Sequence, residues 1–330
     1  MRLAGAAGFP YDYCMLAPEP RIAAVVQGYA RVIDRFGNKI GTRPMVLPTG
    51  EFFPDAFTGD EQSVQALFER MKQHAGLGDL VMSVRVAPVE GQGGGCGGSC
   101  ACDSAGAAPV QRLVRDETGW HLAVLAGEVR IAEVLTTHMA RGLAVAFLVE
   151  SGGGSSAPVD LVAVALGFGA LLLEGSYVYR KSCGGPSIAH FTELGTEELA
   201  IALAVFAAVG GHRVRLAQRE LGPTQREALG DARAWIESNG DLVERLRQAP
   251  ERVAAGDFEI RETRPWLARV LGSRGPARRA VAATIAADDS LEALEASLGG
   301  APVRAKAKAV DPKLDEIKKL VDEAFQDAEG

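Results

Sequence analysis

The stretch "LVAVALGFGALLL", residues 161–173, is the most apolar segment of the chain and decides what the fold has to bury. It is 13 residues long, with Asp160 before it and Glu174 after it. A helix that spans a bilayer needs about 20 consecutive apolar residues, so this segment is too short to be one. We therefore expect a buried core helix, extending over roughly 158–181.

Helices are expected on both sides of this segment, and a small sheet before it. The apolar spacing and the end signals place helices over roughly 21–36, 60–76, 129–149, 195–209 and 223–247. Alternating, Val-rich sequence predicts a strand at 80–87, and two further short strands are expected near 110–115 and 120–125. This pattern indicates an α+β fold, with a mainly helical body and a small β-sheet.

Composition shifts divide the chain into five parts. They are an N-terminal helical segment (1–44), the main domain (45–250), a helical C-terminal extension (251–300), a linker (301–310) and a terminal amphipathic helix (311–330). One face of the terminal helix is apolar and consists of Leu314, Ile317, Leu320, Val321 and Phe325. This face is a candidate partner-binding surface, which docks either on the rest of the chain or on another protein.

Composition and charge bound the possible functions. The 330 residues are 47% hydrophobic and 23% charged, which is enough apolar sequence for a packed core. A net charge of −7 argues against nucleic acid as a main partner. Pro10, Tyr11 and Asp12 interrupt the first residues before the core of a signal peptide forms. We therefore expect a cytoplasmic protein with a protein partner and without a membrane span.

Four stretches of the main domain occur in a characteristic order and spacing. They are "PDAFTGDEQSVQALFERMKQHAGL" at 54–77, "THMARG" at 137–142, "APVDLVAVALGFGALL" at 157–172 and "GTEELAIALAVFA" at 195–207. Together they resemble a family of uncharacterised bacterial proteins with a zinc-metallopeptidase-like domain, whose central helix carries an H-E-x-x-H motif. The resemblance covers roughly residues 45–210 and implies a metallopeptidase-like core.

The residues that would form the zinc site of that family are mostly replaced. In the intact motif, two histidines four residues apart hold Zn²⁺ and the glutamate activates the bound water. The resemblance places His138 at the first ligand position, Met139 at the general-base position and Gly142 at the second ligand position. Asp160 is the carboxylate that remains in the following segment, where an aspartate often supports a ligand histidine.

Two interpretations of His138 follow from these replacements. It is either the remainder of a vestigial site, paired with Asp160, or a histidine packed in a helix interface. In both, a zinc-dependent hydrolase is disfavoured and no catalytic residue is assigned. The sequence favours a pseudoenzyme, a non-catalytic binding or scaffold protein; a hydrolase with an unrecognised catalytic set is a further alternative.

A cysteine-rich loop supports a different interpretation. The segment "GQGGGCGGSCACDSAG", residues 91–106, holds Cys96, Cys100 and Cys102, and Cys183 is the first candidate for a fourth ligand. Thiolates prefer Zn²⁺, Cu(I) or iron–sulfur clusters, and glycines let a backbone wrap around a metal. The alternatives are therefore a protein that binds zinc or another thiophilic metal, a thiol-redox protein, and a glycine-rich surface loop without a ligand role. No other cofactor is expected.

Overall fold

The computed structural model describes residues 16–87, 112–152, 158–182 and 185–261, all within one compact unit. Within 180–182 and 185–186 it describes the backbone only. The five cysteines, the linker 301–310 and the terminal helix 311–330 lie outside these residues. The metal, redox and docking hypotheses made for them therefore stay predictions.

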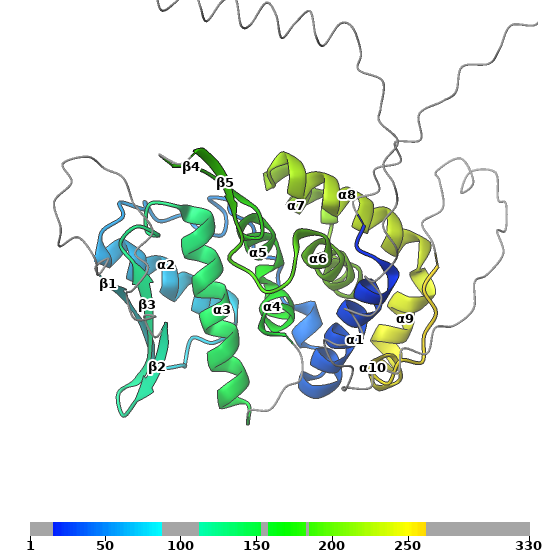
Figure 1. Ribbon diagram of the computed structural model, residues 1–330. Coiled ribbons are helices and arrows are strands. Elements are labelled where there is room, and N and C mark those ends of the chain that lie inside the picture. Colours follow the sequence, from blue (N-terminus) through cyan, green and yellow to red (C-terminus); the bar gives the residue numbers. More distant parts are fainter. Residues whose placement is uncertain (1–15, 88–111, 153–157, 183–184, 262–330) are drawn as a thin grey trace, which may run out of the picture. The chain divides into compact units, whose positions relative to one another are not determined.

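The described part of the chain is mainly helical with two small sheets, which confirms the α+β class (Figure 1). Its helices are α1 (Glu19–Phe36), α2 (Glu61–His74), α3 (Ala132–Glu150), α4 (Val159–Ala163), α5 (Gly169–Gly175), α6 (Thr196–Gly210), α7 (Val214–Glu220), α8 (Pro223–Ser238), α9 (Gly240–Gln248) and α10 (Pro250–Ala254), with a 3-10 turn η1 (Ile40–Thr42) and a π-helical turn η2 (Val164–Phe168). Its strands are β1 (Met82–Ala87), β2 (Leu113–Asp116), β3 (Gly119–Leu125), β4 (Val178–Ser182) and β5 (Gly185–Ala189).

The larger sheet has the strand order β1-β3-β2, and its three strands are those expected from the sequence. β1 runs parallel to β3, with Val84 opposite Leu122, and β2 runs antiparallel to β3, with Leu113 opposite Leu122. Alternate residues of β3 are buried, namely Trp120, Leu122 and Val124. Period-2 alternation is the signature of a strand with one buried face, and this face looks toward α3 (Figure 1).

The central apolar segment is not the single helix that the sequence predicts. It is divided into α4, η2 and α5, and the chain then turns into the β4–β5 hairpin. The break lies at Gly167, whose φ of 101° is a conformation that glycine adopts readily. The Gly167 carbonyl accepts a hydrogen bond from the amide of Val46 at 2.9 Å, and a Cβ at position 167 would overlap the carbonyl oxygen of Pro44. A contact with a distant segment, rather than local sequence, therefore ends this helix.

Buried helices surround this segment. Every residue of α6 from Leu199 to Ala207 is buried, whereas α1 buries one face, which includes Val25, Tyr29 and Ile33. Both helices share a hydrophobic core with α3, α5 and α8. The N-terminal helix is thus part of the same core as the apolar segment.

Among the described helices, α3 alone is long and apolar enough to cross a membrane by length and composition. Half of the residues in its apolar window are buried within the protein, where α3 contacts β3, α4 and α5. The helix also carries the charged or polar residues Glu133, His138 and Arg141. A core helix of a folded domain has the same composition, so α3 gives no clear evidence of a membrane span.

Candidate functional site

Helix α3 carries the residues that the predicted resemblance to zinc peptidases singles out. At 100° per residue, His138 and Arg141 lie on one side of the helix. Met139 is completely buried, and a Cβ at Gly142 would lie 2.9 Å from Cδ1 of Leu122 in the sheet. The two positions that the resemblance would assign to a general base and a second metal ligand are therefore part of the packed core.

His138 faces Glu128, which follows β3 and is 7% exposed. Its Nε2 lies 3.3 Å from Oε1 of Glu128, but without the alignment of a hydrogen bond. The firm partners of this carboxylate are Arg112, whose Nη1 and Nη2 donate at 2.6 and 2.9 Å, and the amide of Leu125, which donates at 2.9 Å. Burial raises the pKa of Glu128, but His138, Arg112 and the Leu125 amide together lower it to about 2.

Asp160 belongs to a second cluster on the same side of α3. Its side chain is fully buried, and its Oδ1 accepts a hydrogen bond from Nε of Arg141 at 2.8 Å. Its Oδ2 accepts hydrogen bonds from the amides of Glu193 and Leu194 at 2.7 and 2.9 Å. Arg141 also forms an ion pair with the Glu193 carboxylate. The aspartate therefore fixes the loop before α6 against α3 and α4.

Phe191 connects the two clusters. Its ring meets the His138 ring edge-on, with the centroids 5.6 Å apart, and its carbonyl accepts a long hydrogen bond of 3.4 Å from Nη1 of Arg141. The Phe191 amide donates to the carbonyl of Gly175 at 3.1 Å, which fixes the residue at the end of α5. The structure thus places His138 and Asp160 on one side of α3, each with its own partners: Glu128 and Phe191 for the histidine, Arg141 and two amides for the aspartate.

Sequence reasoning missed Arg141, Glu128 and Arg112. One signal was available for the first of them. Arg141 lies within an otherwise apolar stretch of α3, and Asp160 opens the next apolar helix. A buried charge requires an opposite charge, so these two residues are natural partners. Glu128 offers no such signal, because its position opposite Arg112 depends on the β2–β3 hairpin.

Among the residues that the structure describes, no three His, Cys, Asp or Glu side chains lie close enough together to hold a metal ion. This finding does not extend to the cysteine loop, where the prediction remains open.

On the other side of α3 lies an apolar pocket of about 310 Å³. Loop residues 48–57, helix α2, helix α3 and helix α5 enclose it. Its apolar walls include Leu67, Leu135 and Leu171, and Phe57 at its edge is 45% exposed. The polar groups that line it are Thr49, Ser63, Thr136 and an ion pair of 2.9 Å between Arg70 and Asp55.

The buried Glu128 carboxylate makes the stability of the protein depend on pH. Because folding lowers its pKa from 4.5 to about 2, its contribution is fully present above pH 4.5 and is lost as the pH falls toward 2. This shift corresponds to a contribution on the order of 3 kcal/mol at neutral pH. Replacement of Glu128 by Gln should lower the free energy of unfolding by this order at pH 7 and by progressively less below pH 4.5.

Urea unfolding of both proteins between pH 3 and 7 measures this difference. Glu117→Gln, on the exposed β2–β3 turn, is the matched control and should change little at any pH. A difference between the wild type and Glu128→Gln that stays constant with pH would show that the charge of Glu128 does not stabilise the fold.

In comparisons with protein-family models, with curated protein sequences and with solved structures, nothing matches this chain.

Proposed function

We propose that this chain is a non-catalytic, cytoplasmic binding protein, built on a metallopeptidase-like core whose central helix no longer holds zinc. The proposal rests on the packing at the side of α3 that carries His138 and Arg141. There, Asp160 binds Arg141 and two backbone amides, and Phe191 covers His138. A catalytic zinc site needs three protein ligands and an open position for water, and the described residues around this helix provide no such arrangement.

The pocket on the other side of α3 is the proposed binding site. Its apolar walls and small polar edge are typical of sites that fix one apolar group. A volume of about 310 Å³ lies at the lower end of the range of ligand pockets, which runs from about 300 to 1,000 Å³. One or two bulky apolar side chains of a protein partner fit this size, and such buried anchors supply most of the affinity of a protein interface.

The ion pair at the edge of the pocket gives the site a polar contact. The side chains of Arg70 and Asp55 are 34% and 55% exposed, so both groups are reachable from solvent. A partner segment that inserts an apolar side chain between Leu67 and Leu135 brings its backbone close to these charges. Backbone carbonyl and amide groups are suitable hydrogen-bond partners for them.

The pocket is tested with N-acetyl-phenylalaninamide, a neutral model of an apolar side chain in a peptide. Methyl NMR is expected to show saturable shifts at Leu67, Leu135 and Leu171 on addition of this compound. Thr136→Phe fills the pocket from α3 and should abolish these shifts, because the introduced ring takes the space of the ligand.

Val149→Phe is the matched control. It adds a phenylalanine to the same helix at a position that is 42% exposed and lies outside the pocket. It should leave the titration unchanged. Methyl groups that do not respond in the wild type, or that respond equally in Thr136→Phe, would contradict the assignment of this pocket.

A further inference from the structure

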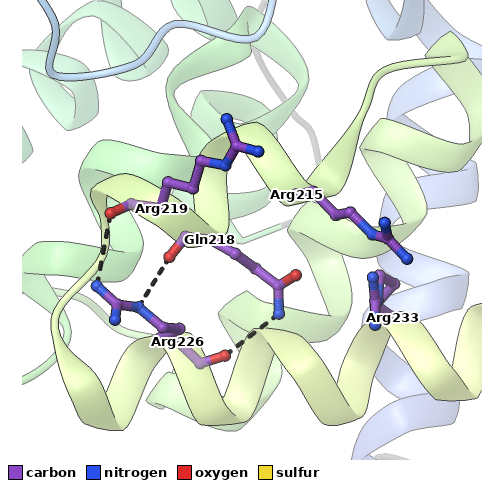
Figure 2. Close-up of a pocket in the computed structure, with 5 residues that line it drawn as sticks. All are labelled: Arg215, Gln218, Arg219, Arg226 and Arg233. Atoms are coloured by element: carbon purple, nitrogen blue, oxygen red, sulfur yellow. Dashed lines mark hydrogen bonds between the residues drawn. The ribbon is translucent and has the colours of Figure 1, made fainter.

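Helices α7 and α8 form a second kind of cavity, which is open to solvent and lined mainly by arginines (Figure 2). Its volume is about 470 Å³, and it is lined by Arg215, Gln218, Arg219, Arg226 and Arg233. Four of these five side chains are cationic, although the whole chain has a net charge of −7. The local charge is therefore opposite to that of the protein.

The spacing of these residues directs them into one space. Arg215, Gln218 and Arg219 are three and four residues apart on α7 and therefore share a face. On α8, Arg226 and Arg233 share a face with Gly230, which lies between them. A Cβ at Gly230 would lie 3.3 Å from Nε2 of Gln218, so the glycine allows the two helices to approach at this point.

Arg226 holds the two helices together. Its Nε donates to the carbonyl of Gln218 at 3.0 Å and its Nη2 donates to the carbonyl of Leu221 at 2.8 Å, with a longer contact to the carbonyl of Arg219 (Figure 2). These carbonyls lie at the end of α7, where no further helical amide is available to them. Arg226 is therefore a positioning residue, and the other arginines are left for a ligand.

Three guanidinium groups have donors to spare. Within the described ranges, Arg215 and Arg219 form no ion pair. The Nε of Arg233 is buried without a hydrogen-bond partner among those residues, and Arg233 forms an ion pair of 3.7 Å with the Glu237 carboxylate. A buried donor without a partner and a group of like charges are both unfavourable. A bound anion removes both penalties.

A cavity of mixed character adjoins this site. It has a volume of about 640 Å³ and shares Arg215, Arg219 and Arg233 with the first cavity. Its other walls include the apolar residues Val214, Leu216 and Ile236 and the carboxylate of Glu237. A ligand whose anionic group binds the arginines therefore has space in this second cavity for a less polar part.

We propose that the α7–α8 cavity binds a small molecule that carries two or more phosphate groups. Guanidinium groups match phosphate oxygens with paired hydrogen bonds, and a diphosphate carries enough charge to balance Arg215, Arg219 and Arg233. The phosphates lie against these arginines, and the body of a larger ligand extends toward Leu216 and Ile236. This site is independent of the apolar pocket beside α3.

Titration calorimetry of the full chain at about 50 mM salt, where charge screening is weak, tests the proposal with pyrophosphate and ADP. Both are expected to bind with a stoichiometry of one. The double variant Arg215→Gln/Arg219→Gln should weaken both by at least about tenfold, because each loses charge-assisted hydrogen bonds. Tighter binding of ADP than of pyrophosphate indicates a ligand whose body uses the adjoining cavity; equal affinities indicate recognition of the phosphates alone.

The matched control is Arg31→Gln/Arg130→Gln, which removes the same charge from exposed positions elsewhere. It should change the affinities less than twofold. The Arg215→Gln/Arg219→Gln protein should still bind N-acetyl-phenylalaninamide beside α3, which separates the two sites. The proposal is wrong if neither anion binds at about 1 mM, or if the control weakens binding equally. It is also wrong if single-stranded RNA of about 20 nucleotides binds more tightly than both and depends on the same arginines, since the site is then one for nucleic acid.

Discussion

Replacement of Asp160 by Asn is expected to lower the free energy of unfolding by about 3–5 kcal/mol. The substitution preserves the shape of the side chain and removes its charge. It leaves the Arg141 guanidinium partly buried beside a neutral group, and the one remaining oxygen cannot accept from both Arg141 and the amides of Glu193 and Leu194. The loss is large because the carboxylate is completely buried and uses both oxygens.

Urea unfolding at neutral pH measures this loss. Glu193→Gln is the matched control, since Glu193 binds the same arginine but is 55% exposed, and it should cost less than about 1 kcal/mol. The double variant Asp160→Asn/Arg141→Gln should be less destabilised than the sum of its single changes. A loss below about 1 kcal/mol for Asp160→Asn would show that this cluster does not support the fold and would reopen a ligand-binding role for the aspartate.

Introduction of an H-E-x-x-H motif by Met139→Glu/Gly142→His is expected to disrupt the fold rather than to create a peptidase. Met139 is completely buried, so the new glutamate would be a buried charge without a partner. An imidazole at position 142 would displace Leu122 from the core face of β3. Each change is expected to lower the free energy of unfolding by several kcal/mol. The two losses together approach the total stability of an ordinary domain.

The fold of the double variant is measured by far-UV circular dichroism. Its zinc content and its cleavage of a peptide panel, with and without chelator, test for a metal site and for peptidase activity. Val149→His, which adds an imidazole at an exposed position of the same helix, should leave the spectrum unchanged. Neither the wild type nor the double variant should show cleavage that a chelator stops. Chelator-sensitive cleavage by the wild type would overturn the proposal that the protein is non-catalytic. A folded double variant with stoichiometric zinc would show that α3 retains an open metal site.

The parts of the fold that local sequence determines were predictable. The strand β1 and the strand β3 have alternating patterns, and each is bounded by turn residues or glycines. The break at Gly167 was not predictable, because it depends on a contact with residues 44–46. The β4–β5 hairpin was missed for a related reason, since the apolar segment before it has the composition of one long helix.

The candidate site was likewise predictable only in part. The family resemblance singled out His138 and Asp160, and a pairing between them was one of two open interpretations. The partners that they have in the structure were not predictable, because Glu128 and Phe191 come from loops whose course is set by tertiary contacts. The arginine cavity was also missed, since α7 was not among the expected helices and its arginines are separated from those of α8 by a turn.

The junction between Gly167 and Val46 has a consequence for the order in which the chain assembles. The two residues are far apart in sequence, yet their hydrogen bond lies at the break in the central apolar segment. Contacts between distant residues form late, because closure of a long loop must come first. The kinked form of this segment therefore belongs to the completed native state rather than to an early helical nucleus. A fragment that begins after residue 46 lacks the donor for the Gly167 carbonyl, so the N-terminal part of the chain and the core segment are expected to unfold as one cooperative unit.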